Sequence, residues 1–292
     1  MNSWLIPLLS FLVLQDPAEP TLNELAALQF IRERVRPVTY NLQDHGVRQA
    51  LVTLRIKDSP LGHRFELLWD VESDETWYQI VGLPPEYESD RRELVASLKS
   101  QALLAVLPPP GSEDKLFRLA MEEDGPYVKI TLWSREGGAK ERPDQEPEQV
   151  RWYAKDGRLV KLRQHAMTPS GRMEFMVGYD WFEIDGQYLI SGMTRALEPV
   201  PVAPDVRSIR TQFHYRKSPT SGLHLLDRLS LTIEKVSEVV EQLYLIDVRV
   251  NDEIDPALVK HLKALPKPGE GAKPTAPSPE GAARVKERPG GA

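Results

Sequence analysis

The stretch that decides the fold runs from Met173 to Trp181 and reads Met-Glu-Phe-Met-Val-Gly-Tyr-Asp-Trp. Its alternate positions hold large apolar or aromatic residues, namely Met173, Phe175, Val177, Tyr179 and Trp181. The opposite positions include Arg172, Glu174 and Asp180. Because successive side chains of a strand point to opposite faces, the stretch predicts a β-strand with one dry and one wet face. Such alternation is typical of antiparallel sheets.

The same period of two recurs along most of the chain. It is carried by Ala50, Val52, Leu54 and Ile56; by Phe65, Leu67 and Trp69; by Val128, Ile130 and Leu132; by Ile209, Phe213 and Tyr215; by Leu229, Leu231 and Ile233; and by Tyr244, Ile246, Val248 and Val250. Asp156-Gly157 and Asp185-Gly186 each separate two such runs, which is a strong hairpin signal. Pro169-Ser170-Gly171 marks a further turn. The pattern predicts a meander of antiparallel strands.

Two helices are expected to cover the dry face of this sheet. The first begins with a capping box of Thr21 and Glu24, and it ends before Pro37. Its expected apolar face comprises Leu22, Leu25, Ala26, Leu28 and Val35. The second begins near Ser89 or Asp90 and ends at three prolines from residue 108. Its expected inner face comprises Leu94, Val95, Leu98, Ala102 and Val106.

The two ends of the chain differ from the middle. Residues 3–14 form an uncharged apolar run, and a polar, proline-rich segment follows from Gln15 to Pro20. We interpret residues 1–18 as a secretory signal, although a buried core segment or an uncleaved anchor would also fit this pattern. Residues 263–292, rich in Pro, Gly, Ala, Lys and Glu, are expected to be a disordered tail. The folded domain is therefore expected to span residues 19–262, and its location is expected to be periplasmic or secreted.

Composition removes several classes of function from consideration. The chain has no cysteine, so thiol nucleophiles, disulfides and cysteine-based metal sites are excluded. Its net charge of −6 is spread along the sequence and gives no basic stripe for nucleic acid. After residue 14 no apolar run is long enough to span a bilayer as a helix. We expect a protein that is peripheral to a membrane at most.

No catalytic or metal-binding signature survives inspection. The sequence lacks the metalloprotease, nucleophile-elbow, calcium-loop and dinucleotide-binding motifs. The six histidines are scattered without metal-ligand spacing. The acids Asp180, Glu183 and Asp185 flank a turn, where Asp is favoured for backbone reasons. We therefore predict no catalytic residue, no metal, no cofactor and no enzymatic activity.

The middle of the chain resembles a known family. The similarity lies in Trp152–Leu162 with its Asp156-Gly157 turn, in Pro169–Phe175, in Tyr179–Ile190, and in the closing segment Val250–Val259. These segments are similar to the outer-membrane lipoprotein-sorting proteins, the LolA/LolB-like periplasmic carriers. The resemblance covers about residues 148–260, and more loosely the first helix and strands. It implies a mainly β (α+β) fold, an incomplete antiparallel β-barrel whose open side is covered by about two helices.

The resemblance also implies a function and a site. It implies an exported envelope protein that binds or carries a lipid, or the acyl chain of a lipoprotein, in an apolar cavity. The residues expected to line that cavity are Phe65, Leu67, Trp69, Met173, Phe175, Val177, Tyr179 and Trp181. On patterning alone, the favoured interpretation of the same side chains is a core packed against the two helices, because an apolar strand face is usually core. The alternative function is a structural or protein-interaction module of the envelope, whose tail would dock on a partner.

Overall fold

The computed structural model describes residues 21–59, 62–106, 110, 117–134, 147–168, 171–197 and 206–265. The expected signal at residues 1–18 and residues 266–292 of the expected tail at 263–292 lie outside the described residues. The described end of the chain reaches Leu265, slightly beyond the expected domain boundary at residue 262.

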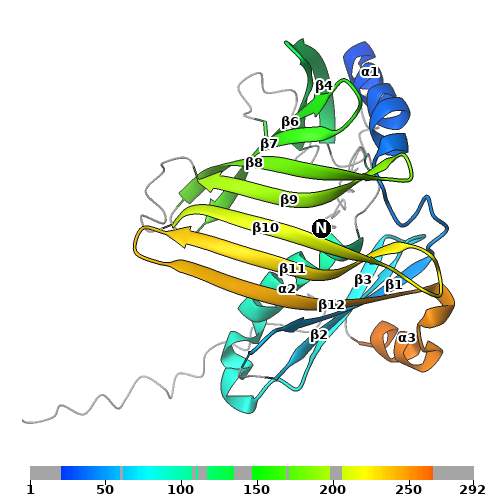
Figure 1. Ribbon diagram of the computed structural model, residues 1–292, viewed down its shortest axis with the longest axis vertical. Helices are drawn as coiled ribbons and strands as arrows, with labels where there is room; N and C mark the ends of the chain where they lie inside the picture. The colour runs from blue at the N-terminus through cyan, green and yellow to red at the C-terminus, as the bar shows by residue number, and fades with distance from the viewer. Residues whose placement is uncertain are drawn as a thin grey trace, which may run out of the picture.

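Twelve strands form one antiparallel sheet, which is open at both edges (Figure 1). The strands are β1 Gln49–Ile56, β2 Arg64–Asp70, β3 Glu75–Val81, β4 Phe117–Asp124, β5 Tyr127–Ser134, β6 Gln149–Ala154, β7 Leu159–Thr168, β8 Gly171–Ile184, β9 Gln187–Leu197, β10 Val206–Lys217, β11 His224–Lys235 and β12 Val239–Val250. Their order in the sheet is β3-β2-β1-β12-β11-β10-β9-β8-β7-β6-β5-β4. The prediction of a mainly β, antiparallel fold is confirmed.

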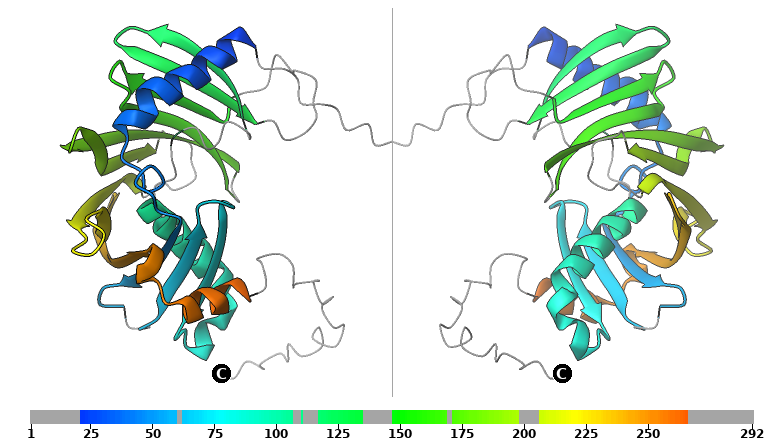
Figure 2. Two further views of the ribbon diagram at one scale, coloured as in Figure 1. Left: turned by 90° about the vertical axis from the view of Figure 1, so that its right-hand side faces the viewer. Right: turned by 90° about the vertical axis from the view of Figure 1, so that its left-hand side faces the viewer.

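The strand order shows how the two ends of the domain meet. Strands β4 to β12 form a meander in which each strand pairs with the next. The last of them, β12, then pairs with β1, so that Ala50 lies opposite Val250. The sheet is strongly curved, and the long helix after β3 lies inside the curve (Figure 2). This helix connects the two edge strands, β3 and β4.

The first helical segment lies against the β4 edge of the sheet. Helix α1, Leu22–Phe30, continues as a π-helical turn, Ile31–Val35, and as a 3₁₀ turn, Arg36–Val38. The side chain of Thr21 accepts a hydrogen bond of 3.2 Å from the amide of Glu24, so the predicted cap on the first turn is present.

The predicted apolar face of this helix is wrong at its N-terminal end. Leu22 is 86% exposed and Leu25 is 47% exposed. The buried stripe instead comprises Ala27, Ile31 and Val35, spaced four residues apart. This spacing keeps the three side chains in line through the helix and its π-helical turn. The small side chain of Ala27 is fully buried within this stripe.

Helix α2, Arg91–Val106, follows a 3₁₀ turn at Pro85–Asp90 and covers β1, β2 and β12. Its predicted inner face is confirmed, because Leu98, Ala102 and Val106 are buried. They pack with Phe65 and Leu67 of β2, which have no exposed surface. This cluster is the largest part of the hydrophobic core.

A short helix, α3, covers the opposite face of the same strands. It spans Pro256–Lys263 and begins at Asp255, whose side chain accepts a hydrogen bond of 2.8 Å from the amide of Ala257. Leu262 of this helix packs with Leu51 and Leu68, which lie on the face opposite the alternating residues Val52 and Leu67. The expectation of one dry and one wet face is therefore wrong for β1 and β2, since these strands lie between two helices and are buried on both sides.

Candidate functional site

The sheet has one inner face, against which both α1 and α2 pack. At the α1 end, Ala27, Ile31 and Val35 contact a cluster that contains Ile130 and Tyr153. At the α2 end, the cluster of Phe65 and Leu67 includes residues of β10, β11 and β12 as well. Residues that pair across neighbouring strands point to the same face of the sheet. The pairings from β5 to β12 therefore show that the two clusters lie on the same face.

Between the two clusters, one row of paired residues crosses the sheet. It begins at Ile130 beneath α1 and continues through Arg151, Leu162, Val177, Arg195 and Ile209. Val177 is 4% exposed and Leu162 is 8% exposed, yet neither belongs to either core cluster. Among the described elements, no helix contacts β7 or β8 as extensively as α1 contacts β4.

The middle of the inner face is therefore distinct from the two core clusters that lie on either side of it. We define the central face as Arg151, Leu162, Phe175, Val177, Tyr179, Trp181, Arg195 and Ile209, which come from strands β6 to β10. Strand β8 contributes half of these residues, because its alternate residues share one face. The surface is largely apolar and aromatic, and two arginines lie within it.

The two largest aromatic side chains of the central face lie side by side. The ring centroids of Tyr179 and Trp181 are 6.3 Å apart. The indole Nε1 of Trp181 donates a hydrogen bond of 2.7 Å to the carbonyl oxygen of Leu159. This bond satisfies the polar atom of the indole, so the rest of the ring is available for apolar contact.

The hydroxyl of Tyr179 lies in a mixed electrostatic environment. Burial raises the pKa of Tyr179 to about 12, although the charges of Arg151 and Arg195 act to lower it. The phenol is therefore protonated at neutral pH and can donate a hydrogen bond. It makes no hydrogen bond to any residue that the structure describes.

The two arginines of the central face differ in their partners. Arg151 donates hydrogen bonds of 3.1 Å and 2.8 Å to the side-chain oxygen of Gln149. The guanidinium of Arg195 lies 5.4 Å from the ring centroid of Phe175. Its Nε is shielded from solvent and has no hydrogen-bond partner. Within the described residues, Arg195 also has no carboxylate partner.

The structure places the predicted site residues in two separate groups. Phe175, Val177, Tyr179 and Trp181 lie together on the central face, and Met173 lies further along β8, opposite Ala166. Phe65, Leu67 and Trp69 lie on β2 within the core cluster that includes α2. Five strands separate β2 from β8 in the sheet. The two groups therefore do not form one continuous lining.

Sequence reasoning missed Arg151 and Arg195. A signal for Arg195 is present, because it occupies an inward position between Met193 and Leu197 in an otherwise apolar alternation. A charged residue at such a position is unusual in a sheet core and points to a specific role. For Arg151 the alternation with Tyr153 gives a similar but weaker signal.

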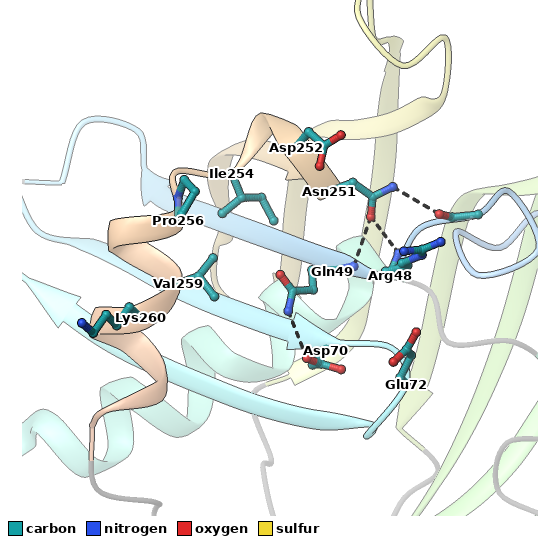
Figure 3. A pocket seen from close by; sticks show the side chains of 11 residues that line it. Arg48, Gln49, Asp70, Glu72, Asn251, Asp252, Ile254, Pro256, Val259 and Lys260 are labelled. Atoms are coloured by element: carbon teal, nitrogen blue, oxygen red, sulfur yellow. Dashed lines mark hydrogen bonds between the residues drawn. The ribbon is translucent and has the colours of Figure 1, made fainter.

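A hollow of about 890 Å³ lies between the start of β1, the end of β2 and the segment from Asn251 to Lys260 that follows β12 (Figure 3). Asn251 accepts hydrogen bonds from the amides of Arg48 (2.7 Å) and Gln49 (3.3 Å), and it donates one of 3.1 Å to the carbonyl of Gly46. Asp70 accepts hydrogen bonds from Gln49 (3.0 Å) and Lys263 (2.7 Å). These polar groups satisfy one another and tie β1 to the segment after β12, which is a structural role.

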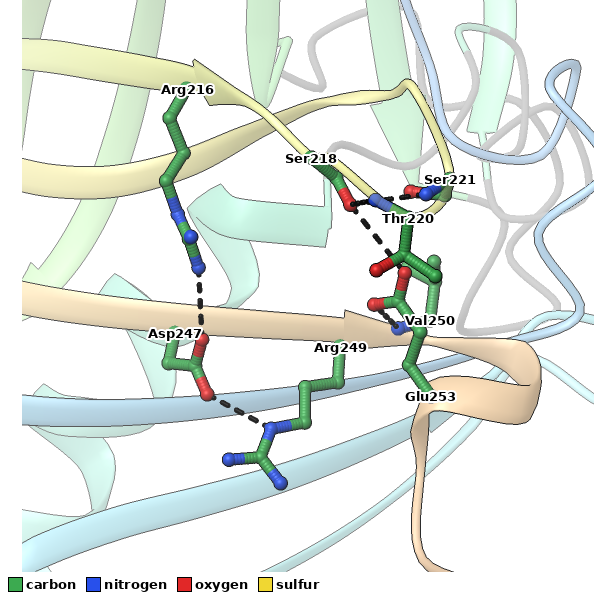
Figure 4. Close-up of polar contacts among 8 residues, drawn as sticks. All are labelled: Arg216, Ser218, Thr220, Ser221, Asp247, Arg249, Val250 and Glu253. Atoms are coloured by element: carbon green, nitrogen blue, oxygen red, sulfur yellow. Dashed lines mark hydrogen bonds and ion pairs between the residues drawn. The ribbon is translucent and has the colours of Figure 1, made fainter.

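The outer face carries a network of charged residues over β10 and β12 (Figure 4). Asp247 accepts hydrogen bonds from Arg216 (3.1 Å) and Arg249 (3.0 Å). Nearby, the hydroxyl of Ser218 accepts hydrogen bonds from the amides of Thr220 (3.3 Å) and Ser221 (3.2 Å) within the β10–β11 turn. The exposed ion pairs of Asp247 with Arg216 and Arg249 contribute little to stability, about 0–1 kcal/mol each.

Two further features are absent from the residues that the structure describes. No group of three or more potential metal ligands occurs within the described part of the chain. No helix of the described residues is long and apolar enough to cross a membrane. Comparison of the chain with protein-family models, with curated proteins and with solved structures gave no match in any of the three.

Proposed function

We propose that the protein binds an apolar ligand, a lipid or the acyl chain of a lipidated protein, on its central face. The observation that carries this proposal is that the aromatic row of β8 lies on the inner face but belongs to neither helix-covered core cluster. Residues such as Phe175 and Trp181 offer apolar contact there. Burying apolar surface of a ligand contributes roughly 25 cal/mol per Å² before the costs of association.

The architecture supports the same function. An open, curved antiparallel sheet with helices on its inner face agrees with the incomplete barrel implied by the resemblance to LolA/LolB-like carriers. In such a half-barrel a ligand would lie between the two helix-covered ends. Export of the protein is part of the proposal and is supported by the apolar run at residues 3–14. We assign the protein no catalytic step.

The test is native mass spectrometry of the processed protein, purified without detergent from an envelope fraction. Organic extraction of the same sample identifies any bound lipid. We compare the wild type with Phe175→Glu, which places a charge on the central face. Met176→Glu is the matched control, because the adjacent position on β8 points to the outer face.

Bound lipid in the wild type and in Met176→Glu, but not in Phe175→Glu, is the expected result. A clean apo mass for the wild type, together with no uptake of added fluorescent fatty acid, would contradict the proposal. That result would favour the alternative of a protein-interaction module in the envelope.

A further inference from the structure

We propose that the ligand carries a carboxylate or phosphate at one end of its apolar chain, and that Arg195 binds this anionic group. This inference rests on the proposed function and specifies the ligand class of the same site. It assigns Arg195 as the anchor for the head group, with the aromatic residues of β8 as the contact surface for the chain.

The first support is the state of Arg195: like Arg163 it has a shielded Nε without a hydrogen bond, but the Nε of Arg163 lies 3.7 Å from the carboxylate of Glu174. No carboxylate of the described residues pairs with Arg195. A shielded N–H group without a partner costs free energy. A ligand anion beside the guanidinium would supply the acidic partner that the described residues do not.

Other arginines of the chain show the contrast. Ion pairs join Arg64 to Glu66 (2.7 Å), Arg158 to Asp156 (2.7 Å) and Arg216 to Asp247 (3.1 Å). Each of these arginines has an acidic partner in the folded chain, although Asp247 is shared with Arg249. Arg195, which lies on the inner face, has none within the described residues.

The second support is the geometry around the guanidinium. The guanidinium of Arg195 lies 5.4 Å from the ring centroid of Phe175, a contact with the ring that does not use the N–H groups of the guanidinium as hydrogen-bond donors. The N–H groups of a guanidinium match the two oxygens of a carboxylate or phosphate. A cationic group held beside an aromatic ring suits a ligand that is anionic at one end and apolar along its length.

The third support is a set of further donors close by. The charges of both Arg151 and Arg195 act on the hydroxyl of Tyr179, so the three groups share one region of the central face. The Tyr179 hydroxyl has no partner among the described residues and is free to donate. Val177 pairs with Arg195, and Leu162 pairs with both Val177 and Arg151, which places the apolar pair between the two cations.

The experiment measures binding of cis-parinaric acid and of its uncharged methyl ester by fluorescence, using the full processed protein. For the wild type we expect the acid to bind about tenfold more tightly than the ester, which is typical of one charge-assisted hydrogen-bonded contact. Arg195→Met should remove this preference and leave ester binding unchanged. Arg195→Lys keeps the charge and should retain most of the preference.

The matched control is Arg210→Met, which makes the same change at an exposed position of β10 whose neighbours point to the inner face. It should bind both probes as the wild type does. Circular dichroism and thermal melting establish that each variant is folded. If Arg195→Met does not fold, the comparison of Arg195→Lys with a further variant, Arg195→Gln, gives the same information.

Competition separates the sources of the anion. Oleoyl lysophosphatidic acid should displace cis-parinaric acid from the wild type, whereas inorganic phosphate at millimolar concentration should not. Displacement by inorganic phosphate alone would overturn the head-group assignment. Equal binding of acid and ester by the wild type, or an unchanged preference in Arg195→Met, would overturn the role of Arg195. Failure of the wild type to bind either probe would instead contradict the proposed function itself.

Discussion

Gly157 in the β6–β7 turn lies directly against the backbone carbonyl of Arg34, so that a β-carbon at position 157 would overlap that carbonyl. Gly157 also has a φ of +95°, which favours glycine. Arg34 belongs to the π-helical turn after α1. The hairpin turn and the helical segment are thus fitted together at a point where only glycine is accommodated.

Replacing Gly157 by Ala should lower the free energy of unfolding by at least about 3 kcal/mol, because overlap with the Arg34 carbonyl adds to the cost of a positive φ. Gly186→Ala is the control. Gly186 also has a positive φ, +78°, but an added β-carbon there meets nothing within 4 Å. It should cost only about 1–2 kcal/mol. Similar losses for both variants in urea unfolding would show that the contact with Arg34 is unimportant.

The two groups of apolar side chains should respond differently to truncation. Phe65→Ala opens a cavity in the core beneath α2 and should cost about 3–5 kcal/mol. Phe175→Ala, on the central face, should cost about 1 kcal/mol and should weaken binding of the apolar probe. Chemical unfolding and probe fluorescence on the same samples measure both effects. A large stability loss in Phe175→Ala without loss of binding would place Phe175 in the core.

Asp70 should make stability depend on acid pH. Burial acts to raise its pKa, but hydrogen bonds from Lys263, Gln49 and the amide of Ser73 outweigh burial and lower the pKa to about 2 from its ordinary 3.8. Because the pKa is depressed in the folded state, its stabilising effect is complete above about pH 5 and is lost as the pH falls from about 4 to 2. The loss amounts to at most about 2 kcal/mol, and salt will reduce it.

The measurement is the free energy of unfolding in urea from pH 2 to pH 6. Asp70→Asn should flatten part of the decline below pH 4, while Asp252→Asn, at an exposed position, should leave the curve unchanged. An unaltered acid limb in Asp70→Asn would mean that the contact with Lys263 does not depress the pKa of this carboxyl.

Tyr215 should tolerate the loss of its hydroxyl. The oxygen is buried and has no hydrogen-bond partner, and burial raises the pKa of Tyr215. Tyr215→Phe should therefore raise the free energy of unfolding by up to about 1 kcal/mol. Tyr40→Phe is the contrasting variant, since the hydroxyl of Tyr40 accepts a hydrogen bond of 2.9 Å from the amide of His224. Tyr40→Phe should lower the free energy of unfolding by about 1 kcal/mol, as measured by thermal unfolding. Equal destabilisation by both would indicate a water partner for Tyr215.

The sheet could be predicted from the sequence because its signal is local. The alternation from Met173 to Trp181 and the Asp185-Gly186 turn each follow from short-range backbone geometry, and both are present as predicted. Burial of Leu51 and Leu68 could not be predicted in the same way. It depends on α3, a helix more than 180 residues further along the chain, whose start is marked only by Asp255-Pro256.

The candidate site shows the same limit. Alternation identifies the inward side of β2 and of β8 equally well, so Phe65 and Phe175 look alike in the sequence. What separates them is the path of α2, which covers Phe65 and not Phe175. Arg195 required the register of β8 with β9 before its isolation from acidic partners could be recognised.

The pairing of Ala50 with Val250 has a kinetic consequence. Hairpins along β4 to β12 can form from neighbouring segments, but β1 must wait for a partner 200 residues away. Contacts of such long range slow folding, because the entropy cost of closing a large loop comes before the stabilising contact forms. A nascent chain that stops before Val239 would leave β1 with a bare edge and α2 with an incomplete core. Such intermediates are prone to aggregate, so synthesis of the last strand commits this protein to its fold.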